Sequence, residues 1–199
     1  MLEVASVHGR FQPFHNGHLE YVLAAKERSA FFWIGITKFD IDLSELTPLG
    51  SEREKPESNP LTYFERITII SRALQDSGVR SSEFRFIPFP IETPVKLSQY
   101  LPTSVPCFTT IYDDWNRRKV RVLREAGYDV EVLWERTNKA VSGHAIRESI
   151  LSGNDIWTSQ VPLATVTYVK KFDIADRLRR LKALHILPED PRDHTPDSR

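Results

Sequence analysis

A loop rich in glycine, arginine and histidine is the feature that most constrains this chain. It reads GRFQPFHNGH and occupies residues 9–18. An apolar run, Val4 to Val7, precedes it, and a helical pattern of Leu19, Val22 and Leu23 follows. We therefore predict a buried strand, a tight loop and the start of a helix. The first turn of a helix presents free backbone N–H groups and the positive end of the helix dipole, so this junction suits an anion.

The side chains of the loop suit a phosphate in particular. Gly9 and Gly17 lack Cβ atoms and allow close backbone approach, while Arg10 offers a planar fork of donors. His15 and His18 are three residues apart, so both can face one site if the helix begins near them. No Cys, Asp or Glu stands close enough in the sequence to complete a metal site. The loop also lacks the Gly-Lys-Ser/Thr of a P-loop and the Gly-x-Gly-x-x-Gly of a dinucleotide site.

Composition excludes several classes of protein. The 199 residues contain 27 Lys and Arg against 27 Asp and Glu, so the net charge is zero. We expect no broad binding to nucleic acid and no membrane association, and self-association into a homo-oligomer is left open. The single cysteine, Cys107, rules out an internal disulfide and favours a cytoplasmic location. It lies in an apolar run, and we expect it to be buried.

Strand and helix patterns alternate along most of the chain. Strands are predicted at residues 3–8, 31–36, 84–89, 108–112 and 128–134, and the main helices between them at 17–29, 62–77 and 114–126. This predicts an α/β, doubly wound, Rossmann-like fold: a mostly parallel five-stranded sheet with helices on both faces. We assign residues 1–160 to this domain and 161–187 to a C-terminal helical extension that breaks near Asp173. Residues 188–199 are predicted to be a disordered tail.

Several helix starts carry capping residues. Thr62 and Glu65 form a predicted capping box, and Asp113 or Asp114 caps the helix that follows the fourth strand. The other aspartate is a candidate ligand for the sugar or base of a substrate. Ser142 is a further predicted cap, with helix expected over 148–151. The cluster Arg117, Arg118, Lys119, Arg121 and Arg124 is interpreted as a solvated basic face. The long polar segment 37–59 is predicted to be a loop that orders on substrate.

Three stretches resemble one superfamily. His15-Asn16-Gly17-His18 matches the H-x-G-H motif of nucleotidylyltransferases, and the longer string GRFQPFHNGHL is similar to archaeal-type nicotinamide mononucleotide adenylyltransferases. NPLTYFER, residues 59–66, resembles their N-P-F-T-x-x-E-R segment. SGHAIR, residues 142–147, resembles their S-G-T-x-I/V-R segment.

The resemblance implies roles for named residues. His15 and His18 would contact the triphosphate and the α-phosphate under attack, while Arg147 and the Ser142 backbone would hold the leaving pyrophosphate. Arg10 would clamp phosphate. The implied nucleotide site comprises Gly9, Arg10, Phe11, Gly17, His18, Ser142, Gly143 and Arg147. Mg²⁺ is the expected cofactor, carried on the phosphates without a dedicated protein site.

Departures from the family pattern concern contacts to phosphate and to the acceptor. His144 replaces the usual Thr, and Ser58 stands where the family has an arginine, with Arg53 and Lys55 upstream. The segment 91–97 lacks the tryptophan that stacks nicotinamide in that family. The candidate acceptor-binding residues are Asp113, Asp114, Trp115, Arg53 and Lys55.

The expected activity is transfer of a nucleotidyl group from a nucleoside triphosphate to a small phosphorylated acceptor, with release of pyrophosphate. The leading hypothesis is ATP plus nicotinamide mononucleotide, giving NAD. The alternative is a cytidylyltransferase that uses CTP on a small phosphate or phosphonate. A non-catalytic nucleotide-binding regulator is a second alternative. A fragment of a class I aminoacyl-tRNA synthetase is disfavoured by the short chain and the missing K-M-S-K-S motif.

Overall fold

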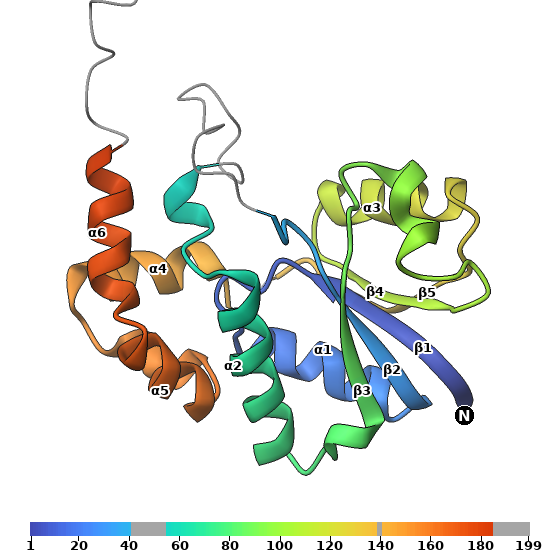
Figure 1. Ribbon diagram of the computed structural model, residues 1–199, viewed down its shortest axis with the longest axis horizontal. Coiled ribbons are helices and arrows are strands. Elements are labelled where there is room, and N and C mark those ends of the chain that lie inside the picture. The colour runs from blue at the N-terminus through green and yellow to red at the C-terminus, as the bar shows by residue number, and fades with distance from the viewer. Residues whose placement is uncertain (41–54, 139–140, 185–199) are drawn as a thin grey trace, which may run out of the picture.

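Five parallel strands form one twisted sheet in the computed structural model, which describes residues 1–40, 55–138 and 141–184 (Figure 1). The strands are β1 (Leu2–Gly9), β2 (Ser29–Ile36), β3 (Phe84–Pro88), β4 (Cys107–Ile111) and β5 (Val130–Glu135). Their order across the sheet is β3-β2-β1-β4-β5, with every neighbouring pair parallel. The chain order reverses between β1 and β4, and open sheets of this kind bind ligands beyond the carboxyl ends of such strands.

Helices connect the strands and follow the last one. They are α1 (Asn16–Lys26), α2 (Tyr63–Asp76), α3 (Asp114–Glu125), α4 (Gly143–Ser152), α5 (Leu163–Lys171) and α6 (Ile174–Leu184). Short 3₁₀ turns lie at η1 (Pro56–Ser58), η2 (Ser81–Glu83), η3 (Pro94–Gln99) and η4 (Ile156–Gln160). The predicted α/β class and the five-stranded parallel sheet are confirmed.

Predicted caps account for three of the helix starts. The Thr62 hydroxyl accepts from the Glu65 N–H at 3.2 Å, and the Glu65 carboxylate accepts from the Thr62 N–H at 2.8 Å. Asp113, not Asp114, caps α3 by accepting from the Asn116 N–H at 2.8 Å. Ser142 caps α4, which begins at Gly143. The predicted helix over 148–151 was therefore wrong at its start, because the Ser142 hydroxyl supports helix five residues earlier.

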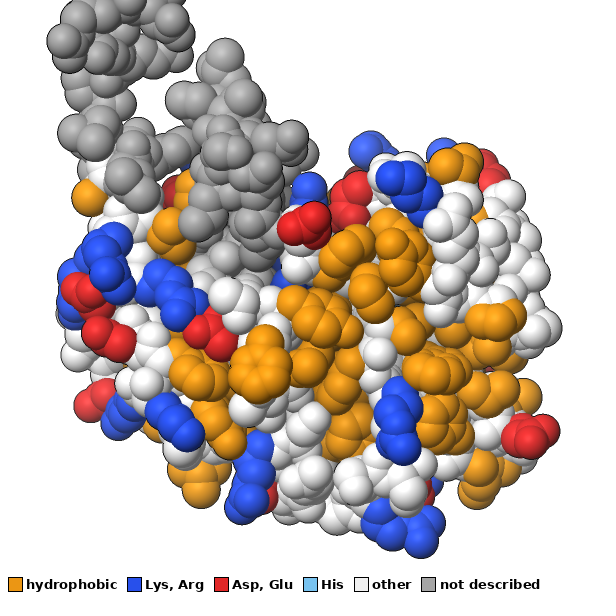
Figure 2. All heavy atoms as spheres, in the orientation of Figure 1, with side chains coloured by type: hydrophobic (Ala, Val, Ile, Leu, Met, Phe, Trp, Pro, Cys, Tyr) orange, Lys and Arg blue, Asp and Glu red, His pale blue; other side chains and the backbone are white. Residues whose placement is uncertain are grey.

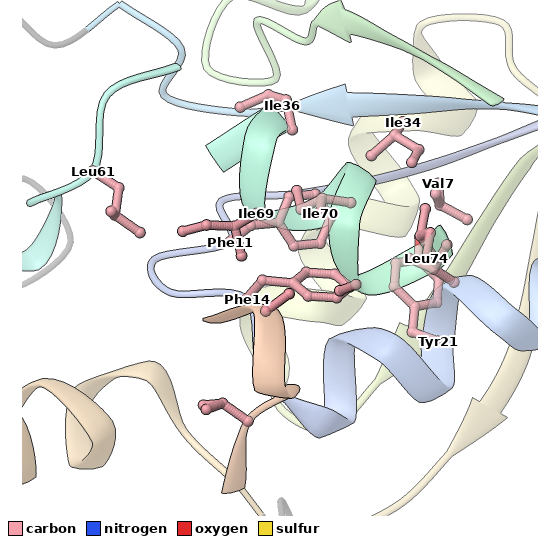
Figure 3. Close-up of a cluster of buried hydrophobic side chains, with 14 of the residues drawn as sticks. Val7, Phe11, Phe14, Tyr21, Ile34, Ile36, Leu61, Ile69, Ile70 and Leu74 are labelled. Atoms are coloured by element: carbon pink, nitrogen blue, oxygen red, sulfur yellow. The ribbon is translucent and has the colours of Figure 1, made fainter. Parts of the chain in front are cut away.

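Each face of the sheet has its own core. On one face, α1 and α2 pack over Val7, Ile34 and Ile36, and Phe11 and Phe14 from the loop after β1 fill the space between them (Figure 3). On the other face, a second core gathers residues of α3, η3 and the strands, including the buried Cys107. In the view of Figure 1, apolar side chains gather over the middle of the molecule (Figure 2).

The C-terminal helices pack beside α2 and α4 (Figure 1). Helices α5 and α6 are separated at Asp173, whose φ of +50° interrupts the helix where the break was predicted. Pro162 is the N-cap residue of α5. Arg177 on α6 donates to both carboxylate oxygens of Glu65, at 2.6 and 2.7 Å, and to the Pro60 carbonyl at 2.8 Å. The predicted tail at 188–199 lies outside the described residues.

Candidate functional site

The two histidines of the H-x-G-H motif form a capping box at the N-terminus of α1. His15 is the N-cap residue, and its Nδ1 accepts from the His18 N–H at 3.2 Å. In return, the His18 Nδ1 accepts from the His15 N–H at 3.4 Å. The rings stack with centroids 3.6 Å apart and planes 16° from parallel. Both imidazoles therefore lie together at the N-terminus of α1, as the i, i+3 spacing predicted.

Buried side chains fix the path of the loop that carries the histidines. Phe11 has a φ of +54° and is almost fully buried, with the edge of its ring against His18 at a centroid distance of 4.9 Å. A Cβ on Gly9 would lie 2.8 Å from the Phe11 ring, so only glycine fits there. The Gln12 side-chain amide donates to the Leu61 carbonyl and accepts from the Leu61 N–H, at 2.7 and 2.9 Å.

Arg66, which the sequence reasoning missed, ties this loop to the end of β2 and the start of α2. Its guanidinium is fully buried. It donates to the carbonyls of Arg10, Thr37, Lys38 and Thr62, at 3.0, 2.8, 2.8 and 3.3 Å. Burial lowers the pKa of Arg66 to about 10, so the side chain stays positive at neutral pH. The sequence feature that could have indicated Arg66 is its position directly after Glu65 of the capping box.

The second predicted phosphate site, the start of α4, meets the same loop. Arg147 is buried and donates to the Gln12 carbonyl at 2.7 Å and to the Ser58 hydroxyl at 3.2 Å. A Cβ on Gly143 would lie 2.8 Å from the Gln12 carbonyl oxygen and 3.3 Å from the Arg147 guanidinium. The helix can approach the loop this closely only because residue 143 is glycine. The side chain of His144 is exposed.

A cavity of about 340 Å³ lies beyond the carboxyl ends of β1 and β4. Most of the predicted site residues line it: Gly9, Arg10, Phe11, His15, Gly17, His18, Gly143, Asp113 and Trp115. Ser142 and Arg147 do not line the cavity, but each adjoins a residue that does. Ser142 precedes Gly143, and Arg147 donates to the Gln12 carbonyl. Asp114 does not line it, contrary to our expectation, because its side chain points to solvent and pairs with Arg117. Lys55 does not line it either, and Arg53 lies outside the described residues.

The cavity also has lining residues that the sequence reasoning did not select. Lys119 was predicted to lie on a solvated basic face, which was wrong, because α3 turns this residue toward the sheet. The Lys119 ammonium is buried and donates to the His8 carbonyl at 3.0 Å. His8 itself is buried, and its ring centroid lies 4.6 Å from that of Phe89. Burial, and then the charge of Lys119, hold the pKa of His8 well below its ordinary value.

On the rim, the Arg136 guanidinium lies 4.5 Å from the centre of the Trp134 ring and donates to Glu20 at 2.8 Å. Trp115 is 37% exposed. Within the described ranges, no group of three or more His, Cys, Asp or Glu side chains is placed to hold a metal ion. No helix in the same ranges combines the length and apolar character needed to cross a membrane.

The chain is similar in sequence to known nucleotidyltransferases. No protein-family model matches the chain. The phosphonoformate cytidylyltransferase of Streptomyces viridochromogenes is 42% identical over 173 residues, covering 87% of this chain and 94% of that protein. The nicotinamide-nucleotide adenylyltransferase of Saccharolobus solfataricus is 30% identical over 174 residues, covering 87% and 93%.

Solved structures show the same fold. A bifunctional NMN adenylyltransferase/ADP ribose pyrophosphatase from Francisella tularensis matches with a TM-score of 0.65 at 18% sequence identity. The match covers 92% of this chain and 53% of that one, so the chain spans about half the length of that structure. Sequence relatives and fold together show that this chain is a nucleotidyltransferase of the H-x-G-H nucleotidylyltransferase superfamily.

Proposed function

We propose that this enzyme transfers the cytidylyl group of CTP to a phosphonate or phosphate oxygen of a small acceptor and releases pyrophosphate. The relative that is 42% identical is a cytidylyltransferase, whereas the nicotinamide-nucleotide adenylyltransferases of Saccharolobus solfataricus and Picrophilus torridus are 30% and 31% identical. The choice of nucleotide rests on this difference.

The observation that carries the choice of acceptor is the packing of Phe89, the first aromatic residue after β3. Its ring is 1% exposed and rests on the backbone of Gly35, where a Cβ would come within 2.8 Å of it. On its other side it packs against His8. The ring is therefore part of the core and offers no free face for a nicotinamide.

The reaction needs positioning more than proton transfer. The acceptor oxygen is already ionised at neutral pH, so it attacks the α-phosphorus without a general base. A new P–O bond forms there while the bond to the bridging oxygen breaks, and the electron pair leaves with pyrophosphate. We propose that His15 and His18 hydrogen-bond the α-phosphate as charge shifts in the transition state. Arg10 clamps phosphate oxygens from the same wall of the cavity.

The leaving group would lie toward α4. Its N-terminus presents the backbone around Gly143 to the cavity, and Arg147 holds that turn against the Gln12 carbonyl. We propose that Mg²⁺ arrives on the triphosphate and neutralises part of its charge, since the lining of the cavity is mainly cationic and neutral.

Nicotinamide mononucleotide with ATP is the second candidate. Trp115 favours it, because this partly exposed ring lines the cavity and could stack on a nicotinamide or adenine base. In that case Trp115 would supply the stacking surface that the segment after β3 lacks.

Pyrophosphate release distinguishes the two candidates. CTP and ATP are each combined with Mg²⁺ and either phosphonoformate or nicotinamide mononucleotide, and products are identified by mass spectrometry. Our proposal predicts release with CTP and phosphonoformate, giving a cytidylylated phosphonate. Release restricted to ATP and nicotinamide mononucleotide, with formation of NAD, would refute it and establish the second candidate. His18→Ala serves as the inactive control.

A further inference from the structure

His8, near the carboxyl end of β1, has an imidazole without a hydrogen-bond partner in the described part of the chain. Both ring nitrogens are buried, and neither has a hydrogen-bond partner among the described residues. The backbone of the same residue is fully engaged. Its N–H donates to the Tyr21 hydroxyl at 3.2 Å, and its carbonyl accepts from Lys119 at 3.0 Å. The lack of partners therefore concerns the imidazole alone.

The position of His8 places this imidazole beside the acceptor side of the cavity. Residues alternate across a strand, so His8 faces α3 and Phe89 while Val7 faces α1 and α2. His8 lines the cavity together with Thr37, Thr110, Trp115 and Lys119. His8 lies on β1 and Thr110 on β4, Thr37 follows β2, and the other two residues lie on α3. The proposed function would bring a small acceptor to this wall of the cavity.

A structural role alone does not account for a histidine here. Burying polar ring nitrogens without partners costs free energy, and a phenylalanine would stack on Phe89 without that cost. Buried polar atoms without a partner are uncommon in folded proteins and call for a reason, of which ligand binding is one. The low pKa of His8 keeps its imidazole neutral, so it can donate one hydrogen bond and accept another.

We infer that His8 determines acceptor specificity. Its imidazole donates a hydrogen bond to the polar group of the acceptor that is not cytidylylated, such as a carboxylate beside the phosphonate. The Lys119 ammonium lies opposite the charge of that group. The inference deepens the proposed function and rests on it for the class of acceptor. Because both nitrogens are covered, the contact requires a local rotation of the imidazole that keeps its packing against Phe89. His8 then contributes to binding of the acceptor and leaves binding of the nucleotide unchanged.

Variants of His8 test this in the full-length protein. His8→Phe keeps a flat ring against Phe89 and removes both nitrogens, whereas His8→Gln keeps a donor. We expect His8→Phe to raise the KM for phosphonoformate about tenfold or more while the KM for CTP changes less than about twofold. His8→Gln should recover part of the loss. Tyr128→Phe is the matched control, because it removes a buried hydrogen bond to the Leu101 carbonyl on the same face but does not line the cavity.

A direct readout follows the ring itself. The ¹⁵N resonances of the His8 imidazole, assigned by comparison with His8→Phe, should shift when phosphonoformate is added to the complex with CTP. A purely structural histidine would not respond in this way. Unchanged resonances together with an unchanged acceptor KM in His8→Phe would overturn the inference.

Failure of the proposed function gives a different result. If the wild type uses ATP and nicotinamide mononucleotide instead, the cytidylyl proposal is wrong, and the acceptor KM of His8→Phe is then measured with that acceptor. A rise still supports a role for His8 in acceptor binding, and no rise refutes it. If neither phosphonoformate nor nicotinamide mononucleotide binds the wild type, the inference about His8 is refuted as well.

Discussion

Replacing Gly143 with alanine sets two physical effects against each other. Alanine is the better helix former by about 1 kcal/mol, so helix propensity alone predicts a more stable protein. The structure predicts the opposite. The added Cβ would lie 2.8 Å from the Gln12 carbonyl oxygen, and that atom belongs to backbone and cannot rotate away. The start of α4 must therefore move away from the loop that carries His15 and His18.

The size of the effect follows from what the movement breaks. The Gln12 carbonyl accepts from Arg147 at 2.7 Å, and hydrogen bonds from charged donors contribute about 1.5–3 kcal/mol. Forcing a methyl group into a packed contact costs about 1–3 kcal/mol more. With the gain in helix propensity subtracted, we expect a loss of about 3 kcal/mol. For a chain of this length, that lowers Tm by about 6–12 °C.

Thermal unfolding and steady-state pyrophosphate release measure both consequences. Gly143→Ala should lower Tm and should also lower kcat/KM, because we propose that the displaced turn faces the leaving pyrophosphate. Gly78→Ala is the control. At φ +83° it carries backbone strain of about 1–2 kcal/mol, but no atom lies within 4 Å of its added Cβ and it is remote from the cavity. A Gly143→Ala protein as stable and as active as the wild type would refute the reasoning.

Three further predictions concern other parts of the structure. His18→Ala should lose at least about a hundredfold in kcat while its circular dichroism stays that of the wild type, and near-normal turnover would remove His18 from the catalytic machinery. Glu65→Gln should cost about 2 kcal/mol at pH 7 in urea unfolding. Burial raises the pKa of Glu65, but the hydrogen bonds from Arg177 and Thr62 outweigh it and leave the pKa below 4.5. The difference in unfolding free energy between wild type and Glu65→Gln should therefore shrink as pH falls below that value. A difference that does not depend on pH would contradict the role of the Glu65 carboxylate. Because the folded protein disfavours protonated His8, the unfolded chain takes up more protons below pH 6.5, and stability should fall by up to about 1.4 kcal/mol between pH 7.5 and 5.5. His8→Phe should lack this component, and an identical pH slope in the variant would rule out His8 as its source.

Local patterns were sufficient to predict the sheet and most helix starts. Alternation of apolar runs with helical periodicity predicted five parallel strands, and the caps at Thr62, Asp113 and Ser142 depend on hydrogen bonds within four residues. Such bonds can be inferred from sequence spacing. The start of α4 was placed too late because Gly143 and His144 are weak helix formers, and the cap outweighed that preference.

Long-range burial could not be predicted in the same way. Lys119 belongs to a run of basic residues, and only the orientation of α3 on the sheet decides that this one faces His8. Arg66 serves carbonyls of residues up to 56 positions away, which no local pattern encodes. His8 was read simply as the end of a strand, although alternation across that strand places it opposite Val7.

Arg66 has a consequence for how substrate scope can change in this superfamily. The Thr37 and Lys38 carbonyls that it binds lie at the start of the long polar segment 37–59, and the Thr62 carbonyl follows that segment. The Arg66 side chain thus connects both ends of this segment to the Arg10 carbonyl, in the loop that carries His15 and His18. Ser58 and Leu61 contact Arg147 and Gln12, so they must stay in place if the proposed triphosphate site is to keep its geometry. Loop grafts from related enzymes should therefore begin after Lys38 and end before Ser58 if new acceptors are to be introduced without loss of nucleotide binding.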